Sequence, residues 1–311
     1  MKILVTGGAG YIGTSLVPAL LERNYDVTVL DNLMYDQNVL LEYYIKDNFS
    51  FVYGDIRDKQ IIKELTTKSD VVIHLASIVG APACKKNETL AKEVNVDGTK
   101  NIVDQLSNDQ ILLFASTGSV YGKIEGMCNE DWTPNPLSLY GSTKLDGERM
   151  ALNLNNSVAF RFATAYGLSP RLRLDLLPND FVLNAIRNKY LVVYDKKFRR
   201  TFIHVTDIVR SYIHMLDNID KVKGNAYNIG SELNNYTKED LVNKIKQHVD
   251  FQVYYADEGI PDPDQRDYEV SYRKLAETNF EVNIDIDRGI QELVDGFENL
   301  RVRSDFANIS F

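Results

Sequence analysis

The sequence predicts an α/β protein whose first half forms a doubly wound parallel sheet. Short, uninterrupted apolar runs recur in this half, and amphipathic segments of helical length separate them. Uninterrupted apolar runs are typical of strands buried on both faces, and the helices between them supply the crossover connections that parallel strands need. A glycine-rich turn directly after the first apolar run indicates the same fold class.

The expected elements follow in order along the chain. Strands are expected at residues 3–5, 26–30, 51–53, 70–75 and 111–115, and helices from Tyr11 to about Arg23, at Thr89–Leu106 and at Tyr140–Leu154. We also expect residues 158–162 and 201–204 to return to this sheet. From about Leu168 the alternation stops and shorter elements follow, which predicts a domain over residues 1–167, with some later chain returning to it, and a smaller lobe over residues 168–311.

Composition excludes several classes of protein. The chain has 311 residues, 44% of them hydrophobic, and a net charge of −9, which disfavours non-specific binding to nucleic acid or to an anionic membrane. Its two cysteines, Cys84 and Cys128, belong to no Cys/His cluster, so we expect no metal site and a reducing compartment. The N-terminus lacks the apolar stretch of a signal peptide, and no run reaches about 18 apolar residues. We therefore expect a cytoplasmic protein.

The glycine-rich turn carries the strongest functional signal. Residues 7–13 read G-G-A-G-Y-I-G and satisfy both GxGxxG and GxxGxxG, between the first expected strand and the first expected helix. Glycines permit a tight turn and a close approach of the backbone to a pyrophosphate, at which the helix N-terminus points. We therefore expect a Rossmann-like dinucleotide-binding domain whose cofactor contacts Gly7, Gly10, Tyr11, Ile12 and Gly13.

Asp31 indicates which dinucleotide binds. It ends the second expected strand, 18 residues after Gly13, and Asn32 rather than an arginine follows it. A carboxylate at this position can accept hydrogen bonds from the ribose 2′-hydroxyl of NAD, whereas it would repel the 2′-phosphate of NADP. We therefore predict NAD, with Asp31 and Asn32 at the adenosine ribose. The alternative is that Asp31 only caps the following turn.

A further acidic position follows the third expected strand. Residues 54–58 read G-D-I-R-D, and Asp55 could accept a hydrogen bond from the adenine amino group while Ile56 packs on the ring. The alternative is a turn in which the aspartate caps the next helix.

Two segments provide candidate catalytic groups. Tyr140 and Lys144 are four residues apart at the start of an expected helix, so they share one face. An ammonium group next to a tyrosine favours the phenolate, which makes the pair a candidate general base for a sugar hydroxyl. Ser116 and Thr117 follow the strand 111–115, whose carboxyl end should face the ligand crevice. Alternatively, these segments are an exposed helix start and a Ser/Thr turn.

Nearly the whole chain resembles the extended short-chain dehydrogenases/reductases of the nucleotide-sugar epimerase/dehydratase family. The motifs TGGAGYIG, HLAS, NVDGT, STGSVYG, YGSTK and IHVTD occur in the family's order. The resemblance implies that Thr117 binds the sugar hydroxyl, Tyr140 is the base and Lys144 its partner. It places the cofactor near Leu75, Ala76, Ser77, Asn95 and Ser116, and the substrate, a nucleotide-diphosphate sugar, near Thr117, Thr164, Asn179, Arg200 and Arg266.

Departures from the family pattern narrow the range of reactions that this chain is expected to catalyse. The 4,6-dehydratases of the family carry an Asp-Glu pair directly after the catalytic threonine, whereas this chain has Gly118 and Ser119. Thr164 stands where many members carry a substrate-binding asparagine. The segment 169–173, S-P-R-L-R, adds positive charge that we expect at the mouth of the cleft, where it could contact a phosphate or an unusual sugar, or form only a loop.

These observations leave several reactions open. We expect an NAD-dependent epimerase that oxidises the sugar, most often at C4, and returns the hydride to the other face. The alternative is a 4-dehydrogenase that releases the keto sugar; a variant dehydratase, a reductase and an NAD-sensing module without catalysis are weaker alternatives. The resemblance also implies a homodimer formed through the helices at 89–106 and 140–154. The many Asn, Lys and Ile residues indicate an AT-rich bacterial genome, and we therefore expect a role in polysaccharide biosynthesis.

Overall fold

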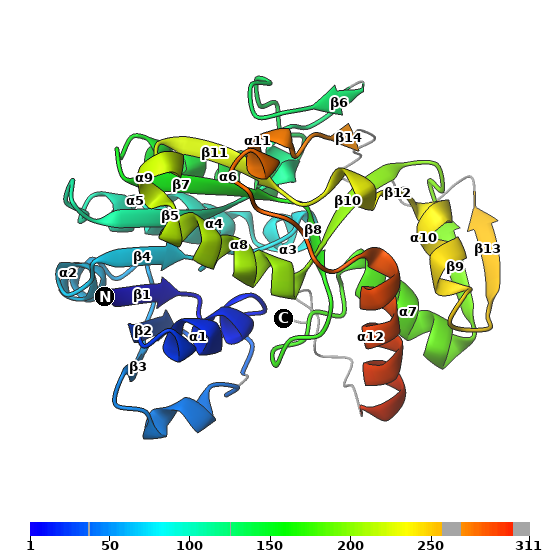
Figure 1. Ribbon diagram of the computed structural model, residues 1–311, viewed down its shortest axis with the longest axis horizontal. Helices are drawn as coiled ribbons and strands as arrows, with labels where there is room; N and C mark the ends of the chain where they lie inside the picture. Colours follow the sequence, from blue (N-terminus) through cyan, green and yellow to red (C-terminus); the bar gives the residue numbers. More distant parts are fainter. Residues whose placement is uncertain (37, 125, 257–268, 301–311) are drawn as a thin grey trace.

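A seven-stranded parallel sheet forms the centre of the protein in a computed structural model that describes residues 1–36, 38–124, 126–256 and 269–300 (Figure 1). The strand order is β11-β7-β5-β4-β1-β2-β3, and every neighbouring pair is parallel. This arrangement confirms the predicted doubly wound sheet. The strands are β1 (Lys2–Thr6), β2 (Asp26–Asp31), β3 (Phe49–Tyr53), β4 (Val71–His74), β5 (Ile111–Thr117), β7 (Ser157–Phe162) and β11 (Asn225–Ile229).

Alternate residues of these strands bury against helices on opposite faces. In β1, Ile3 and Val5 belong to one hydrophobic core together with helices α1 (Gly13–Glu22) and α8 (Val205–Asp217). Leu4 belongs to a second core on the other face. That core includes residues of α2 (Lys59–Thr67), α5 (Thr99–Val103) and α6 (Leu139–Leu152). Both faces of the sheet are thus covered, which explains the uninterrupted apolar runs in the sequence.

The chain order reverses direction at β1, and this reversal positions the site. The sheet continues from β1 through β2 to β3 on one side and through β4 to β5 on the other. Ligands of such sheets bind outside the carboxyl ends of the strands at this switch point. The Gly-rich turn after β1 lies there, and so do the loops that follow β2, β4 and β5.

The second lobe has its own core beside the sheet (Figure 1). Helices α7 (Leu177–Asn188), α10 (Lys238–Ile245) and α12 (Ile286–Asn299) pack together around it. The remaining strands are β8 (Thr164–Tyr166), β10 (Arg199–His204) and β12 (Asn235–Thr237) in a three-stranded sheet, β9 (Tyr190–Tyr194) with β13 (Gln252–Ala256), and β6 (Met127–Cys128) with β14 (Glu269–Val270). The remaining helices are α3 (Ala81–Lys86), α4 (Glu88–Lys92), α9 (Ile219–Val222) and α11 (Arg273–Ala276), with 3-10 turns η1 (Leu41–Ile45), η3 (Gly118–Val120) and η4 (Glu232–Asn234).

Two predicted elements differ from the structure. Residues 201–204 lie in β10, which pairs with β8 and β12 and not with the large sheet; β11 takes the edge position beside β7 instead. Residues 201–204 and 225–229 are both short and mix apolar with polar side chains, so their patterns could not show which sheet each joins. The expected helix Thr89–Leu106 is interrupted by the π-helical turn η2 (Glu93–Gly98), between α4 and α5.

The described part of the chain contains no candidate membrane-spanning helix, metal site or disulfide. No helix there is both long enough and apolar enough to cross a bilayer. No group of three or more His, Cys, Asp or Glu side chains among these residues could hold a metal ion. Cys84 and Cys128 are both buried and unpaired with each other.

Candidate active site

A continuous cavity opens at the carboxyl ends of the strands and runs from the Gly-rich turn to helix α6. Both lobes contribute to its wall, since β8 and the loop after it face the sheet. Most residues predicted from the sequence line this cavity. They are Gly7, Gly10, Tyr11, Ile12, Gly13, Asp31, Asn32, Asp55, Ile56, Leu75, Ala76, Ser77, Ser116, Thr117, Tyr140, Lys144 and Thr164.

The Gly-rich turn leaves no room for side chains where it meets the loop after β4. Gly7 has φ +71°, and a Cβ atom there would lie 2.6 Å from the backbone nitrogen of Ala76. Only glycine fits a positive φ at such close backbone contact. The turn therefore brings the N-terminus of α1 to the cavity, where the positive end of the helix dipole suits a pyrophosphate. The N–H groups of Thr14, Ser15 and Leu16 already donate to the Gly10 and Ile12 carbonyls.

Asp31 is held in a fixed orientation at the end of β2. Its Oδ2 atom accepts a hydrogen bond from the Ala9 N–H at 2.9 Å, and its Oδ1 atom accepts one from the Leu33 N–H at 2.8 Å. Burial raises the pKa of this carboxyl above its usual range, while the two amides oppose the shift. Each oxygen retains a second lone pair, so the carboxylate can still accept from ribose hydroxyls.

Asp55 is engaged by neighbouring side chains. Its carboxylate receives hydrogen bonds from Arg57 Nε and Nη2 at 3.0 and 2.9 Å and from Asn32 Nδ2 at 3.0 Å. Burial alone would raise its pKa, but the hydrogen bonds from Arg57 and Asn32 together outweigh burial and lower it. Asp55 is therefore a carboxylate fixed beside Asn32 at the same end of the cavity as Asp31.

Helix α6 brings Tyr140 and Lys144 to the opposite end. Ser138 caps the helix by accepting a hydrogen bond from the Gly141 N–H at 3.2 Å. A Cβ atom at Gly141 would lie 2.7 Å from the Ser119 carbonyl oxygen, so glycine lets the helix approach the turn after β5. Thr117 begins that turn, and its hydroxyl accepts a hydrogen bond from the Ser119 N–H at 3.2 Å. Tyr140, Lys144 and Thr117 thus share one wall.

Lys144 is almost completely buried. It is 4% exposed, and its Nζ atom lies 4.3 Å from the centroid of the Phe114 ring. Burial lowers the pKa of its ammonium group to about 7, which the nearby Cys84 and Glu148 groups partly oppose. A cation–π contact and a nearby carboxylate both favour the charged form in this apolar setting.

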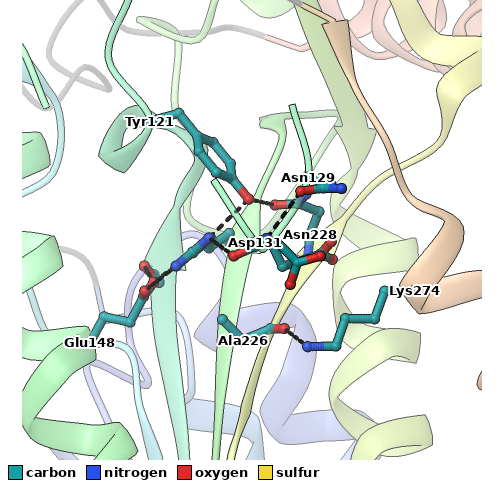
Figure 2. Close-up of polar contacts among 10 residues, drawn as sticks. Tyr121, Asn129, Asp131, Glu148, Ala226, Asn228 and Lys274 are labelled. Carbon is teal, nitrogen blue, oxygen red and sulfur yellow. Dashed lines mark hydrogen bonds and ion pairs between the residues drawn. The ribbon is translucent and has the colours of Figure 1, made fainter. Parts of the chain in front are cut away.

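A buried polar network adjoins this end of the cavity through Ser116. Figure 2 shows the part of the network that contains Tyr121, Glu148 and Asn228. The Ser116 hydroxyl donates to Glu148 Oε2 at 2.5 Å, and Glu148 forms an ion pair with Arg161 at 2.6 Å. Arg161 Nη1 also donates to the Tyr121 hydroxyl at 2.9 Å, which in turn donates to Asn228 Oδ1 at 2.7 Å. The network joins α6 to strands β5, β7 and β11. Sequence reasoning missed Glu148, although it lies one turn beyond Lys144.

Asn95, which the resemblance places near the cofactor, is not among the described residues that line the cavity. Its Oδ1 atom accepts from the Ser77 hydroxyl and the Ile78 N–H, both at 2.8 Å. Its Nδ2 atom donates to the Ile78 carbonyl at 3.0 Å and to the Thr143 hydroxyl at 3.1 Å. The amide thereby uses its full hydrogen-bonding capacity. Asn95 fastens the loop after β4 to α6.

Two expected substrate contacts, Asn179 and Arg200, are not among the described residues that line the cavity. Asn179 is completely buried, accepts from the Gly167 N–H at 3.0 Å and donates to the Arg173 carbonyl at 2.9 Å, so it holds the loop between β8 and α7. Arg200 lies in β10 opposite Tyr236 and is outside the described cavity wall. Asn179 thus stabilises a loop of the second lobe, and a substrate contact of Arg200 stays a prediction. Arg266 lies outside the described residues.

Two residues of the segment 169–173, Arg171 and Arg173, line the cavity. Arg171 and Arg173 are both buried in the wall. Arg173 forms an ion pair with Asp175, through bonds of 3.0 and 2.5 Å. The sequence predicted positive charge from these two arginines at the cleft, but charged residues are rarely buried, so their burial was not predicted.

The sheet, its switch point and the cavity are those of a dinucleotide-binding α/β protein. A family model described as the NAD dependent epimerase/dehydratase family matches residues 3–230. The UDP-N-acetyl-alpha-D-glucosaminuronate decarboxylase of Bacillus cytotoxicus is 30% identical over 96% of this chain and 98% of that protein. The CDP-paratose 2-epimerase of Salmonella typhi is 26% identical over 95% of this chain and 98% of that protein.

Solved structures agree with this result. The UDP-glucuronic acid 4-epimerase of Bacillus cereus, solved with UDP-glucuronic acid and NAD, is 25% identical with a TM-score of 0.82, over 96% of this chain and 99% of that chain. The protein therefore belongs to the NAD-dependent epimerase/dehydratase family, and NAD is its cofactor.

Proposed function

We propose that this protein is a nucleotide-sugar epimerase that oxidises its substrate at C4 and reduces it again on the same bound NAD. The observation that carries the proposal is that the two ends of the cavity are lined by different kinds of residue. Tyr140, Lys144 and Thr117 line one end, and the Gly-rich turn with Asp31 lines the other. Similarity to the UDP-glucuronic acid 4-epimerase supports a nucleotide sugar as substrate and C4 as the position.

In this proposal the chain's own groups manage the proton. Bound NAD supplies a hydride acceptor and donor. Tyr140 takes the proton from the sugar hydroxyl at its phenolic oxygen, because the ammonium group of Lys144 favours the phenolate. The Thr117 hydroxyl orients the same sugar oxygen. The apolar surroundings of Lys144 exclude water from this end of the cavity and strengthen each of these interactions.

The distribution of carboxylates argues against a dehydratase. Elimination of water needs an acid and a base near the sugar. Among the described residues that line the cavity, the carboxylates are Asp31 and Asp55, and both lie at the adenosine end. Gly118 and Ser119 form the turn after Thr117 without an acidic side chain. The wall beside Tyr140 is thus equipped for oxidation and reduction rather than elimination.

Net oxidation remains the second candidate, and one experiment separates the two. The purified protein with its bound NAD is mixed with UDP-, GDP- and CDP-sugars, including UDP-glucuronic acid, and the NADH absorbance band is followed without added NAD. An epimerase converts the sugar to a stereoisomer with no lasting band. A band that rises and stays until a keto compound is supplied would indicate a 4-dehydrogenase and contradict the proposal.

The assembly and the cellular role complete the proposal. We place a homodimer contact on the π-interrupted helix at residues 88–103 and on α6, because both helices lie on one side of the sheet and carry partly buried apolar side chains. A cytoplasmic role in polysaccharide biosynthesis is consistent with a nucleotide-sugar substrate. The molar mass in solution, measured by light scattering, tests the dimer.

A further inference from the structure

Arg171 is a buried cation with two unsatisfied donors. It is 2% exposed, and its Nε and Nη2 atoms have no hydrogen-bond partner. Removing a guanidinium group from water is costly in free energy unless a counter-charge or acceptors replace the lost hydration. Because Arg171 lines the cavity, a ligand in the cavity can supply what the described part of the chain does not.

The surroundings of Arg171 fix its place along the cavity. The Ser169 hydroxyl donates to the Tyr11 carbonyl at 2.6 Å, and the Arg171 N–H donates to the Thr14 hydroxyl at 3.4 Å. These bonds fasten the loop of the second lobe to the first turn of α1. The guanidinium lies over the Tyr35 ring, 3.9 Å from its centroid. Arg171 is therefore next to the helix N-terminus that suits a pyrophosphate.

The other cations of the wall are already engaged or lie elsewhere. Among the described lining residues, the cations are Lys144, Arg171 and Arg173. Lys144 is at the Tyr140 end, and Arg173 has its counter-charge in Asp175. Asp175 and Asp31 attract Arg171 only at longer range, and neither forms a salt bridge with it. A dianionic pyrophosphate lying along α1 would meet Arg171 as its available cation.

We propose that Arg171 binds the pyrophosphate of the dinucleotide from the second lobe, so that the cofactor is clamped between the first turn of α1 and the loop after β8. A guanidinium group can donate two parallel hydrogen bonds to phosphate oxygens, which matches the pair of unsatisfied donors. The inference rests on the placement of NAD in this cavity and is independent of which sugar reaction follows. The substrate's own diphosphate is the other source of the same chemistry.

Calorimetric titration of the nucleotide-free full chain distinguishes these sources. The probes are adenosine, ADP-ribose, NAD and UDP. We expect Arg171→Met to weaken the binding of ADP-ribose and of NAD about 10- to 100-fold, as for loss of a charge-assisted hydrogen bond. The affinity for adenosine should stay unchanged. Arg171→Lys should fall between, because it keeps the charge without the planar fork. The assignment would be overturned if only the affinity for UDP fell, or if the affinity for adenosine fell as much as that for NAD.

Thermal unfolding without nucleotide separates binding from a structural role. Arg171→Met should unfold at the wild-type temperature or above it, because the variant removes an unpaired buried charge, while its stabilisation by NAD shrinks. Arg273→Met, at an exposed arginine, should change neither quantity. A lower unfolding temperature with unchanged NAD affinity would make Arg171 structural and refute the inference. Failure of the wild type to bind NAD would refute the placement of the cofactor as well.

Discussion

The hydroxyl of Ser116 donates a 2.5 Å hydrogen bond to the carboxylate of Glu148, and this bond joins β5 to the helix that carries Tyr140 and Lys144. Glu148 is also the buried ion-pair partner of Arg161 on β7. The position of α6 in the cavity wall therefore depends on a polar network behind it, and not only on apolar packing.

We predict that Glu148→Ala lowers the free energy of unfolding by about 3–5 kcal/mol, because it leaves Arg161 buried without its counter-charge. Urea denaturation of the nucleotide-free protein measures the loss. Glu277→Ala is the matched control, since Glu277 pairs with Arg273 on the surface and its removal should cost less than about 1 kcal/mol. Similar losses in both variants would show that the buried network adds no stability.

Asp31 should decide between the two dinucleotides. We predict that Asp31→Asn weakens NAD binding about 10-fold or more, because the amide loses charge-assisted acceptance from the ribose hydroxyls. The affinity for NADP should fall less than that for NAD, or rise, because the variant no longer repels the 2′-phosphate. Titration calorimetry with both dinucleotides checks the ratio, with Asp26→Asn at the exposed start of β2 as the control. An unchanged ratio would mean that Asp31 only caps its turn.

Lys144 should make the stability of the nucleotide-free protein depend on pH. Burial lowers its pKa from 10.5 to about 7, so between these values the unfolded chain binds a proton that the folded chain does not. Stability therefore rises with pH over this window, by about 2 kcal/mol between pH 7 and 9. Lys144→Met should lack this contribution. We expect the difference in unfolding free energy between the variant and the wild type to shrink as the pH rises to 9, and a constant difference would contradict the prediction.

Tyr140→Phe should separate catalysis from cofactor binding. The ring is retained and the proton acceptor is lost, so turnover should fall about 100-fold or more while NAD affinity stays within about threefold. Tyr121→Phe is the control for loss of a buried phenol outside the cavity wall, in the network of Figure 2. That variant should lose stability rather than turnover per folded molecule. Full turnover in Tyr140→Phe would remove Tyr140 from the proposed mechanism.

Local patterns were sufficient to predict the sheet and one side of the cavity. The glycine-rich turn, Asp31, and the spacing of Tyr140 and Lys144 each describe neighbouring residues within one element or at its end. Because the carboxyl ends of parallel strands converge, these separate motifs could be placed in one crevice before the structure was known.

Long-range choices could not be predicted in the same way. The pattern of residues 201–204 fits either sheet, and only tertiary packing assigns it to β10 and leaves the edge of the large sheet to β11. The sequence predicted ligand contacts for Asn95 and Asn179, and in the structure their side-chain amides form hydrogen bonds within the protein. Arg171 was expected at the mouth of the cleft or on a loop, and the structure buries it in the cavity wall.

The central claim is that the substrate loses and regains one hydride on the same bound NAD at C4. The most direct test is to run the wild-type reaction in D2O with only the protein-bound NAD and to examine the product by NMR. We predict the C4 stereoisomer of the nucleotide sugar with no deuterium on any ring carbon, because the hydride never exchanges with solvent. A product that carries deuterium on carbon, or that has lost water or its sugar carboxylate, would contradict the claim.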